Sequence, residues 1–281
     1  MVVQCRAKAI SRDLVIVMSD LRIFSYLPNP RIWKATIAAR ICGVDVEIRG
    51  GSPKELGSWL WDFDAQPLSG EERADDADLK SGKVGFSGTL HKTDAFMEAH
   101  PFGTVPAAFS SDGKVGIFES NSIMRTVARL GASRFPLYGR DAYEASRIDS
   151  FLDASLVFAR DSQIYLLSLM SGKLTTEIHS RIRDGFAVYL GGINQALTPD
   201  REFLVGESIS IADICFAAEL ALFFNEKARP GELGKIGVDP ILHDGVDTKY
   251  PRAFAHFDKL RKHPAFVPDM EPYLKKFESS R

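Results

Sequence analysis

Two stretches decide the fold of this chain: HPFGTVPA at residues 100–107 and FESNSI at residues 118–123. The first places Pro106, which cannot donate a hydrogen bond to a sheet, at the start of an apolar strand. If the Val105–Pro106 peptide bond is cis, the backbone N–H and C=O of Val105 turn outward. They can then pair with a peptide-like ligand, although the pattern also fits a simple turn.

The second stretch ends a strand at Phe118 and opens a helix at Ser120. The Ser120 hydroxyl and the unpaired backbone N–H groups of the first helical turn lie at the positive end of the helix dipole. They can receive a carboxylate, and Glu119 beside them can receive an ammonium group. Together they suit the head of an amino acid or of a γ-glutamyl group. Ser120 also fits a plain helix cap.

Outward from these stretches, residues 21–131 predict a mixed α/β domain. An apolar stripe at Trp33, Ile37 and Ile41 predicts its first helix, and the Asp112-Gly113 pair predicts a hairpin turn. The expected strands cover residues 21–26, 44–48, 105–109 and 115–118, and the expected helices cover residues 33–44, 93–99 and 120–130.

Residues of about 50–88 interrupt this domain and carry mostly loop signals, so we expect an irregular insertion. Trp59, Trp61 and Phe63 are its bulky apolar side chains and should attach it to the body of the domain. The insertion could cover a pocket or extend a contact between subunits. Residues 1–20 form an N-terminal extension, whose apolar run at 14–18 suggests an edge strand or a packed arm.

The second half of the chain carries helical periodicity almost throughout, which predicts an all-helical domain over residues 140–281. The expected helices cover residues 141–170, 175–197, 210–226 and 251–262. Ser210 and Asp213 form a capping-box pattern at the start of the third of them. We therefore expect Ser210 and Asp213 to stabilise that helix and to take no part in chemistry.

Composition excludes several classes of function. The 281 residues carry a net charge of -2 with scattered basic residues, which disfavours nucleic-acid binding. Three distant cysteines without a CxxC pair disfavour a disulfide framework and a metal site. No apolar run reaches the roughly 18 residues that a membrane span needs, and no signal-peptide pattern is present, so the cytoplasm is the expected location.

The same stretches resemble the glutathione-binding half of the glutathione transferase superfamily, with theta- and phi-like features. LHKTDAF at 90–96 and FLVGESISIADI at 203–214 extend the resemblance, which covers about residues 21–48 and 89–275. Residues 33–39 and 203–214 are also similar to the glutathione-transferase-like domain of the elongation factor gamma subunit. The resemblance implies an α/β plus all-α fold, in which a thioredoxin-like domain precedes an all-helical domain.

The resemblance implies that glutathione is the co-substrate and assigns its contacts. Ser120 would hold the γ-glutamyl carboxylate with Glu119 near the amine, and Val105 with a cis Pro106 would hold the cysteinyl backbone. The glycyl carboxylate falls to His91 and Lys92, while Thr104 stands where many relatives carry Lys or Gln.

The sequence identifies the residue that activates the sulfur less clearly than it identifies the glutathione contacts. Asn29 is the first candidate, followed by Ser25 and Tyr26, although Asn29 also fits a turn between two prolines. Lowering a thiol pKa of about 8.5 by two units needs roughly 2.7 kcal/mol of anion stabilisation. The second-substrate pocket is expected at Tyr26, Phe102, Phe158 and Tyr165.

The resemblance favours an enzyme in which the glutathione thiolate attacks a hydrophobic electrophile, with detoxification as the usual role. Conjugation, dehalogenation and ether cleavage all fit that chemistry. The alternative is a non-catalytic interaction module of the elongation factor gamma type. A glutaredoxin-like reductase is disfavoured because no cysteine lies near residues 25–30. A homodimer is implied by the resemblance alone.

Overall fold

A computed structural model describes residues 19–72, 78–82, 86 and 88–278. The apolar run expected to form an N-terminal arm, residues 14–18, lies outside the described residues. The strands are β1 (Leu21–Phe24), β2 (Val46–Arg49), β3 (Trp59–Trp61), β4 (Gln66–Pro67), β5 (Leu79–Ser81), β6 (Thr89–Lys92), β7 (Ala107–Ser110) and β8 (Gly116–Phe118). The α-helices are α1 (Pro30–Cys42), α2 (Asp94–Ala99), α3 (Ser120–Leu130), α4 (Ala142–Ser171), α5 (Thr176–Ala196), α6 (Ile211–Phe223), α7 (Pro230–Lys235), α8 (Val246–Lys249), α9 (Pro251–Leu260) and α10 (Val267–Glu278).

The main sheet has the strand order β2-β1-β7-β8. β1 and β2 run parallel, as the intervening helix α1 requires, whereas β7 and β8 form an antiparallel hairpin beside β1. Phe24 at the end of β1 pairs with Ala107 at the start of β7, and Ala107 pairs with Phe118 at the end of β8. Three chain segments therefore meet at one end of this sheet.

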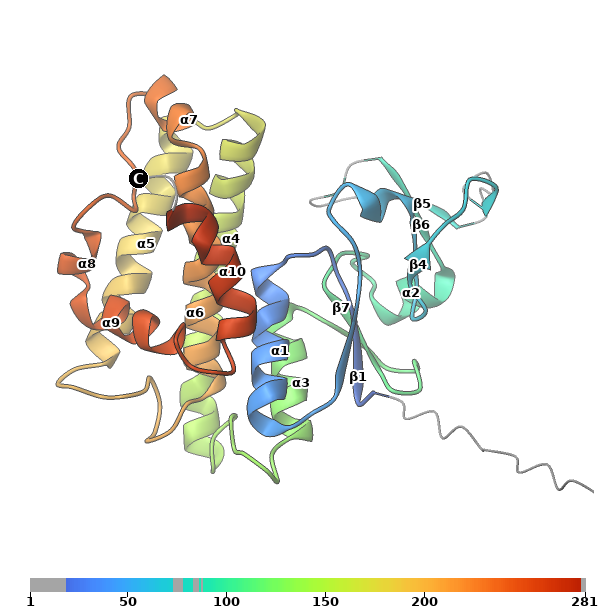
Figure 1. The fold of residues 1–281 in the computed structure, drawn as a ribbon, viewed down its shortest axis with the longest axis horizontal. Coiled ribbons are helices and arrows are strands. Elements are labelled where there is room, and N and C mark those ends of the chain that lie inside the picture. The colour runs from blue at the N-terminus through green and yellow to red at the C-terminus, as the bar shows by residue number, and fades with distance from the viewer. Residues whose placement is uncertain (1–18, 73–77, 83–85, 87, 279–281) are drawn as a thin grey trace, which may run out of the picture.

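Helices α1 and α3 lie between the main sheet and the helical half of the molecule (Figure 1). Helix α6 contacts α1 and also packs on α4, so the largest apolar core continues from the sheet into the helices. The N-terminal mixed α/β part and the helical remainder confirm the predicted fold class.

Local signals explain where α1 begins and ends. Asn29 caps the helix by accepting a hydrogen bond from the Arg31 backbone N–H, and Pro30 takes the first helical position. Gly43 ends the helix in the left-handed region with φ 65°, a conformation that costs glycine little. These caps fix where the chain leaves β1 and enters the helix, which positions the residues between them.

The insertion differs from the expected irregular loop, because its strands β3, β4 and β5 join β6, which follows it, in a second sheet with the strand order β4-β3-β6-β5. Its strands span only 2–4 residues, too few for an alternating pattern to stand out. The central pair joins β3 to β6 across about 30 residues of sequence, a partnership that no local signal encodes. Trp61 is fully buried against Phe24 and Phe96, as the sequence led us to expect for this side chain.

The helical half contains helices that the sequence did not predict. The expected helices at 141–170, 175–197, 210–226 and 251–262 correspond to α4, α5, α6 with the following 3₁₀ turn, and α9. Short α7 and α8 carry too few residues to show periodicity, and α10 contains Pro272, which hides its helical pattern. Among the described residues no helix is both long enough and apolar enough to span a bilayer.

Candidate functional site

The sheet register brings three of the predicted segments together. Ser25 and Tyr26 follow the end of β1, Val105 and Pro106 precede β7, and Glu119 follows β8. The first segment is far from the other two in sequence, yet the pairing of Phe24, Ala107 and Phe118 makes all three neighbours. The candidate site is the cluster at this end of the main sheet.

Glu119 and Ser120 form the junction between β8 and α3. Glu119 is exposed and has φ 66°, the only positive value for a non-glycine residue in the part of the chain that the structure describes. Such a conformation costs about 1–3 kcal/mol and persists where the surroundings enforce it, often at binding sites. Ser120, at the first turn of α3, is only 8% exposed, so a ligand here would meet a mostly desolvated hydroxyl.

Val105 offers its backbone at the same end of the sheet. The Val105–Pro106 peptide bond is cis, as expected, and both residues are half-buried. Within the described ranges no hydrogen bond to the Val105 N–H or C=O is found. The side chain packs against the apolar cluster around Phe24, Trp61 and Phe96, which fixes the backbone beside Ser120.

Asn29 and Ser25 are turned into the protein. Asn29 is 1% exposed, its Oδ1 accepts from the Arg31 N–H at 3.0 Å, and its Nδ2 donates to Ser25 Oγ at 3.0 Å. Ser25 is completely buried, and Gly50 packs so closely on it that a β-carbon there would lie 1.7 Å from the Ser25 carbonyl oxygen. Both polar atoms of the Asn29 side chain therefore already have a hydrogen-bond partner inside the protein.

Tyr26 differs from its two neighbours in being half-buried. Burial raises the pKa of its hydroxyl; the positive charge of Arg31 opposes the shift and the carboxylate of Glu219 adds to it. The phenol therefore stays protonated at neutral pH and can donate a hydrogen bond. The two charged groups that influence its pKa, Arg31 and Glu219, belong to α1 and α6, so the ring lies where the two parts of the chain meet.

The residues expected to hold the glycyl carboxylate lie in the second sheet. His91 and Lys92 belong to β6 and are 7% and 2% exposed. Lys92 Nζ donates to the Gly103 carbonyl at 2.7 Å and lies 4.7 Å from the Trp61 ring centre. The Thr104 hydroxyl lies 3.3 Å from His100 Nε2. Lys92 thus tethers the loop that leads to Val105.

The expected second-substrate residues are not brought together. Phe102 is 62% exposed on the loop before Val105, beside the ring of Phe118. Phe158 and Tyr165 are buried in the helical half, where Phe158 stacks on Tyr189 and Tyr165 donates to Glu226 at 2.6 Å. Helical spacing marked these aromatics, but it could not tell a core position from a pocket.

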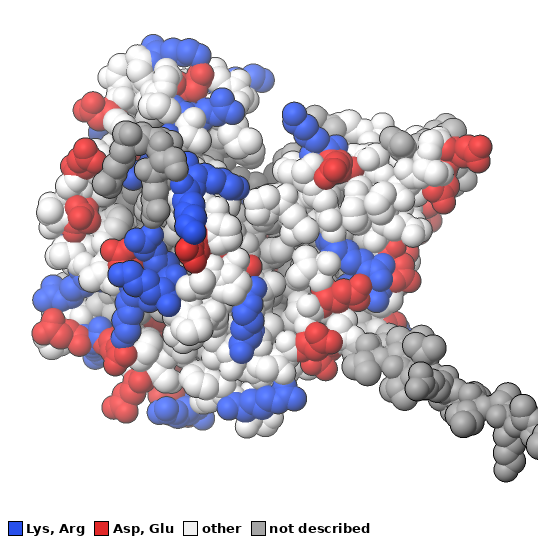
Figure 2. Space-filling model, in the orientation of Figure 1, with Lys and Arg blue, Asp and Glu red and all other residues white. Residues whose placement is uncertain are grey.

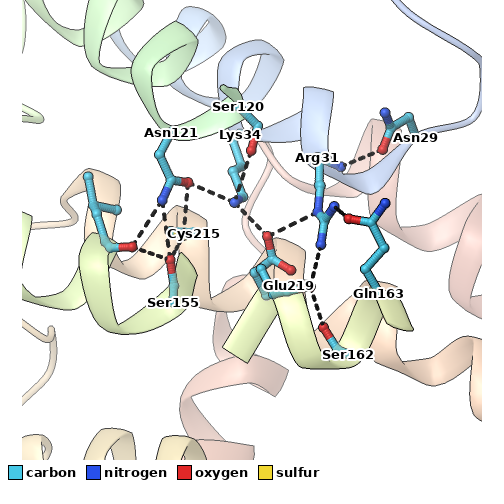
Figure 3. A network of polar contacts seen from close by, with 12 residues as sticks. Asn29, Arg31, Lys34, Ser120, Asn121, Ser155, Ser162, Gln163, Cys215 and Glu219 are labelled. Carbon is cyan, nitrogen blue, oxygen red and sulfur yellow. Dashed lines mark hydrogen bonds and ion pairs between the residues drawn. The ribbon is translucent and has the colours of Figure 1, made fainter. Parts of the chain in front are cut away.

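Sequence reasoning missed a buried polar network beneath Ser120, drawn in Figure 3. Lys34 on α1 donates to Glu219 Oε1 at 2.7 Å, to Asn121 Oδ1 at 2.8 Å and to Ser120 Oγ at 3.4 Å. A single charge flanked by apolar neighbours, as at Lys34 and at Glu219, was the signal that could have predicted the pair.

Several known proteins resemble the chain in sequence. Elongation factor 1-gamma 2 of Oryza sativa subsp. japonica is 30% identical over 201 residues, covering 70% of this chain and 38% of that protein. The glutathione S-transferase-like protein LUC7 of a Fusarium species is 26% identical, covering 72% of this chain and 77% of that protein. The chain spans between a third and two fifths of the length of the elongation factors it matches. No protein-family model matches.

Solved structures decide the fold. Ure2p in complex with glutathione superposes with a TM-score of 0.59 at 16% identity, covering 90% of this chain and 98% of that one. The glutathione transferase URE2P6 of Phanerochaete chrysosporium, with oxidized glutathione, gives 0.61 at 15% identity over 92% and 97% of the two chains. The chain has the glutathione transferase fold. Identities this low establish the fold alone, so the chemistry must be argued from the chain's own residues.

Within this glutathione transferase fold, the capping residues predicted from sequence lie at the start of α6 and not in the cluster at the sheet end. The Ser210 hydroxyl accepts from the Ala212 N–H, and Asp213 accepts from the Ser210 N–H at 2.9 Å, which makes a capping box at the start of α6. In the described part of the chain, no group of three or more potential metal ligands is found.

Proposed function

We propose that the protein binds glutathione at the end of the main sheet and promotes attack of its thiolate on a hydrophobic electrophile. The observation that carries the proposal is the pairing of Ala107 with Phe118, which brings the Val105 backbone and Ser120, at the N-terminus of α3, to the same end of the sheet. Ser120 can take the γ-glutamyl carboxylate and the Val105 backbone the cysteinyl amide. The glutathione complexes among the fold relatives support the same ligand.

Tyr26 is the residue we propose for activation of the sulfur. It is half-buried and keeps its proton, whereas Asn29 and Ser25 are buried and bonded to each other. A phenol that donates to the sulfur favours thiolate over thiol, since a hydrogen bond to a charged group contributes roughly 1.5–3 kcal/mol. The sequence had ranked Tyr26 behind Asn29.

We also propose that the enzyme is a cytoplasmic homodimer, and the outer face of α4 and α5 supports the dimer. Val157 and Val188 are 69% and 78% exposed beside a groove of about 910 Å³. Arg181 and Asp161 border it with opposite charges. A two-fold contact needs such a self-complementary patch.

The first test is glutathione binding by titration calorimetry. Ser120→Ala should weaken binding by about 1.5–3 kcal/mol, because the variant removes a donor to a charged carboxylate. Ser122→Ala, two positions along the same helix, is the matched control and should bind as the wild type does. Unchanged affinity in the Ser120 variant would place the carboxylate elsewhere.

An interaction module of the elongation factor gamma type is the second candidate, and the similarity to those proteins favours it. The two candidates differ in a direct experiment. An enzyme should be retained on immobilised glutathione and turn over a generic aryl halide in the presence of free glutathione. A module should do neither, and the failure of both assays would favour assembly as the role.

A further inference from the structure

A buried ion pair crosses from the sheet domain to the helical half directly beneath the candidate site. Lys34 on α1 and Glu219 on α6 are each 1% exposed, and Nζ lies 2.7 Å from Oε1. Buried charges cost several kcal/mol each to desolvate, and two apolar side chains would hold the same helices together at least as well. Packing alone therefore does not explain why the two charges are buried here.

The other partners of Lys34 indicate what that role is. An ammonium group has three hydrogens to donate and accepts nothing. Its three acceptors here are the Glu219 carboxylate, Asn121 Oδ1 at 2.8 Å and Ser120 Oγ at 3.4 Å (Figure 3). Because Ser120 Oγ accepts from Lys34, its own proton does not point at the ammonium and is left to donate to another group.

Asn121 and its neighbours hold Lys34 in this orientation. Asn121 Nδ2 donates to the Leu152 carbonyl at 3.1 Å and to Ser155 Oγ at 3.3 Å, so its Oδ1 faces the ammonium. Cys215 lies against the same oxygen, and burial raises the pKa of its thiol, which keeps it neutral. Among the residues that the structure describes, Glu219 is the one anion found in contact with Lys34.

The charges in this network do not cancel. Arg31 lies 3.5 Å from the same Glu219 oxygen that Lys34 contacts, so two cations share one carboxylate. Glu219 Oε2 has no hydrogen-bond partner within the described ranges. Glu119, the nearest acidic neighbour in sequence, is exposed to solvent and screened by it. A net positive charge therefore remains beneath the mostly buried Ser120 hydroxyl.

We propose that Lys34 is a positioning residue that makes the start of α3 selective for a carboxylate. It fixes the Ser120 hydroxyl as a donor to the ligand and supplies the charge that a bound carboxylate neutralises. Glu219 holds the ammonium in place without cancelling the charge of both cations. The inference rests on the proposed function, because the carboxylate in question is that of the γ-glutamyl group.

Two ligands separate this role from a structural one. Glutathione carries the carboxylate, and 4-aminobutanoyl-cysteinylglycine is the same tripeptide without it. The wild type should prefer glutathione by about tenfold or more, the value expected for a hydrogen bond to a charged group. The ratio of the two affinities is insensitive to a general loosening of the fold, which would weaken both ligands alike.

The variant to compare is Lys34→Met, which removes the cation that contacts Ser120 and leaves Glu219 paired with Arg31, so that the net positive charge of the network is lost. Its preference for glutathione should fall to about threefold or less, with the affinity for the analogue nearly unchanged. Arg40→Met is the matched control, since Arg40 also joins α1 to the helical half, through Asp269, but is not among the contacts of Ser120. It should keep the wild-type preference.

The outcomes are distinct. If Lys34→Met keeps the full preference, Lys34 has no part in carboxylate selection, although the proposed function stands. If the wild type binds neither tripeptide, the proposed function fails and this inference fails with it. If the wild type binds both tripeptides equally, glutathione is a ligand but its γ-glutamyl carboxylate is not read at Ser120.

Discussion

Asn29 shows how one residue can fit two roles in sequence and be committed to one in the structure. An asparagine between two prolines at the end of a strand could face a ligand or cap a helix. Both polar atoms of its side-chain amide are hydrogen-bonded: Oδ1 accepts from the Arg31 N–H and Nδ2 donates to Ser25 Oγ. Tyr26, three residues earlier, is the group that remains half-buried with a hydroxyl to donate.

The two candidates should respond differently to substitution. Asn29→Ala should lower the free energy of unfolding by about 1 kcal/mol, the usual cost of losing a helix N-cap. Tyr26→Phe should lower kcat by about tenfold or more with little change in glutathione affinity, because it removes one donor to the thiolate. Urea unfolding and steady-state kinetics on both variants test this. Wild-type kcat in Tyr26→Phe, with kcat lost in Asn29→Ala, would return the role to Asn29.

At the scale of elements, α6 is the helix that joins the two parts of the chain. It packs on α1 and α4, and Asp213 secures its start. The Asp213 carboxylate is completely buried and accepts from the Leu204 N–H, from the N–H and hydroxyl of Ser210, and from His256 Nε2. One side chain thus binds the loop before α6, the cap of α6 and helix α9.

Substitutions at this cap should be graded by the contacts they remove. Asp213→Ala should lower the free energy of unfolding by roughly 3 kcal/mol or more, since it strips several hydrogen bonds to a buried charge. Ser210→Ala should cost about 1 kcal/mol, because it removes only the cap. Thermal and urea unfolding measure both. Equal losses in the two variants would show that Asp213 acts only through the capping box.

The α1–α6 ion pair should make stability depend on pH in the acid range. Burial opposes ionisation of Glu219, but Lys34 and Arg31 outweigh it and hold the pKa below its ordinary value of 4.5. A carboxyl whose folded pKa is lowered stabilises the fold above its unfolded pKa, and this stabilisation is lost as pH falls through the folded value.

The check is the difference in unfolding free energy between the wild type and Glu219→Gln, measured from about pH 7 down to pH 3. It should stay constant above about pH 5 and shrink below pH 4.5. Asp244→Asn, at an exposed position, controls for general acid effects. A difference that is the same at both ends of the range would mean that Glu219 is not ionised in the fold.

At the scale of the whole molecule, the surface is mixed in charge. Basic and acidic side chains are interspersed over the helical part of the face shown in Figure 2, in keeping with the net charge of -2. The apolar exposure is more localised. Several of the large apolar side chains exposed in the described structure belong to α4 and α5: Leu156, Val157, Ile164, Leu167, Met170 and Val188.

If the outer face of α4 and α5 around Val157 and Val188 joins two copies, charged substitutions on it should separate them. Val157→Asp combined with Val188→Asp should convert a dimer into a monomer in analytical ultracentrifugation, because a two-fold contact buries each introduced charge twice. Val115→Asp, at a position 57% exposed before β8, is the control and should leave the mass unchanged. A wild type that sediments as a monomer would remove the dimer from the proposal.

The sequence by itself determined the local structure. The Asp112-Gly113 turn, the capping box at Ser210 and the helical periodicity of the second half act over a few residues. Each is set by backbone geometry and short-range hydrogen bonding, so each can be recognised without knowing what packs against it. That was sufficient to predict the fold class and the segments from which the candidate site is built.

The tertiary structure alone decided which of those residues are buried in the core and which lie at the candidate site. Lys34 and Glu219 meet across 185 positions of sequence, and β3 pairs with β6 across the insertion. Neither partnership has a local signal, because each is selected by burial and by the complementarity of distant surfaces. For the same physical reason Phe158 and Tyr165 became core residues, Asn29 became a cap, and Ser120 gained a buried cation beneath it.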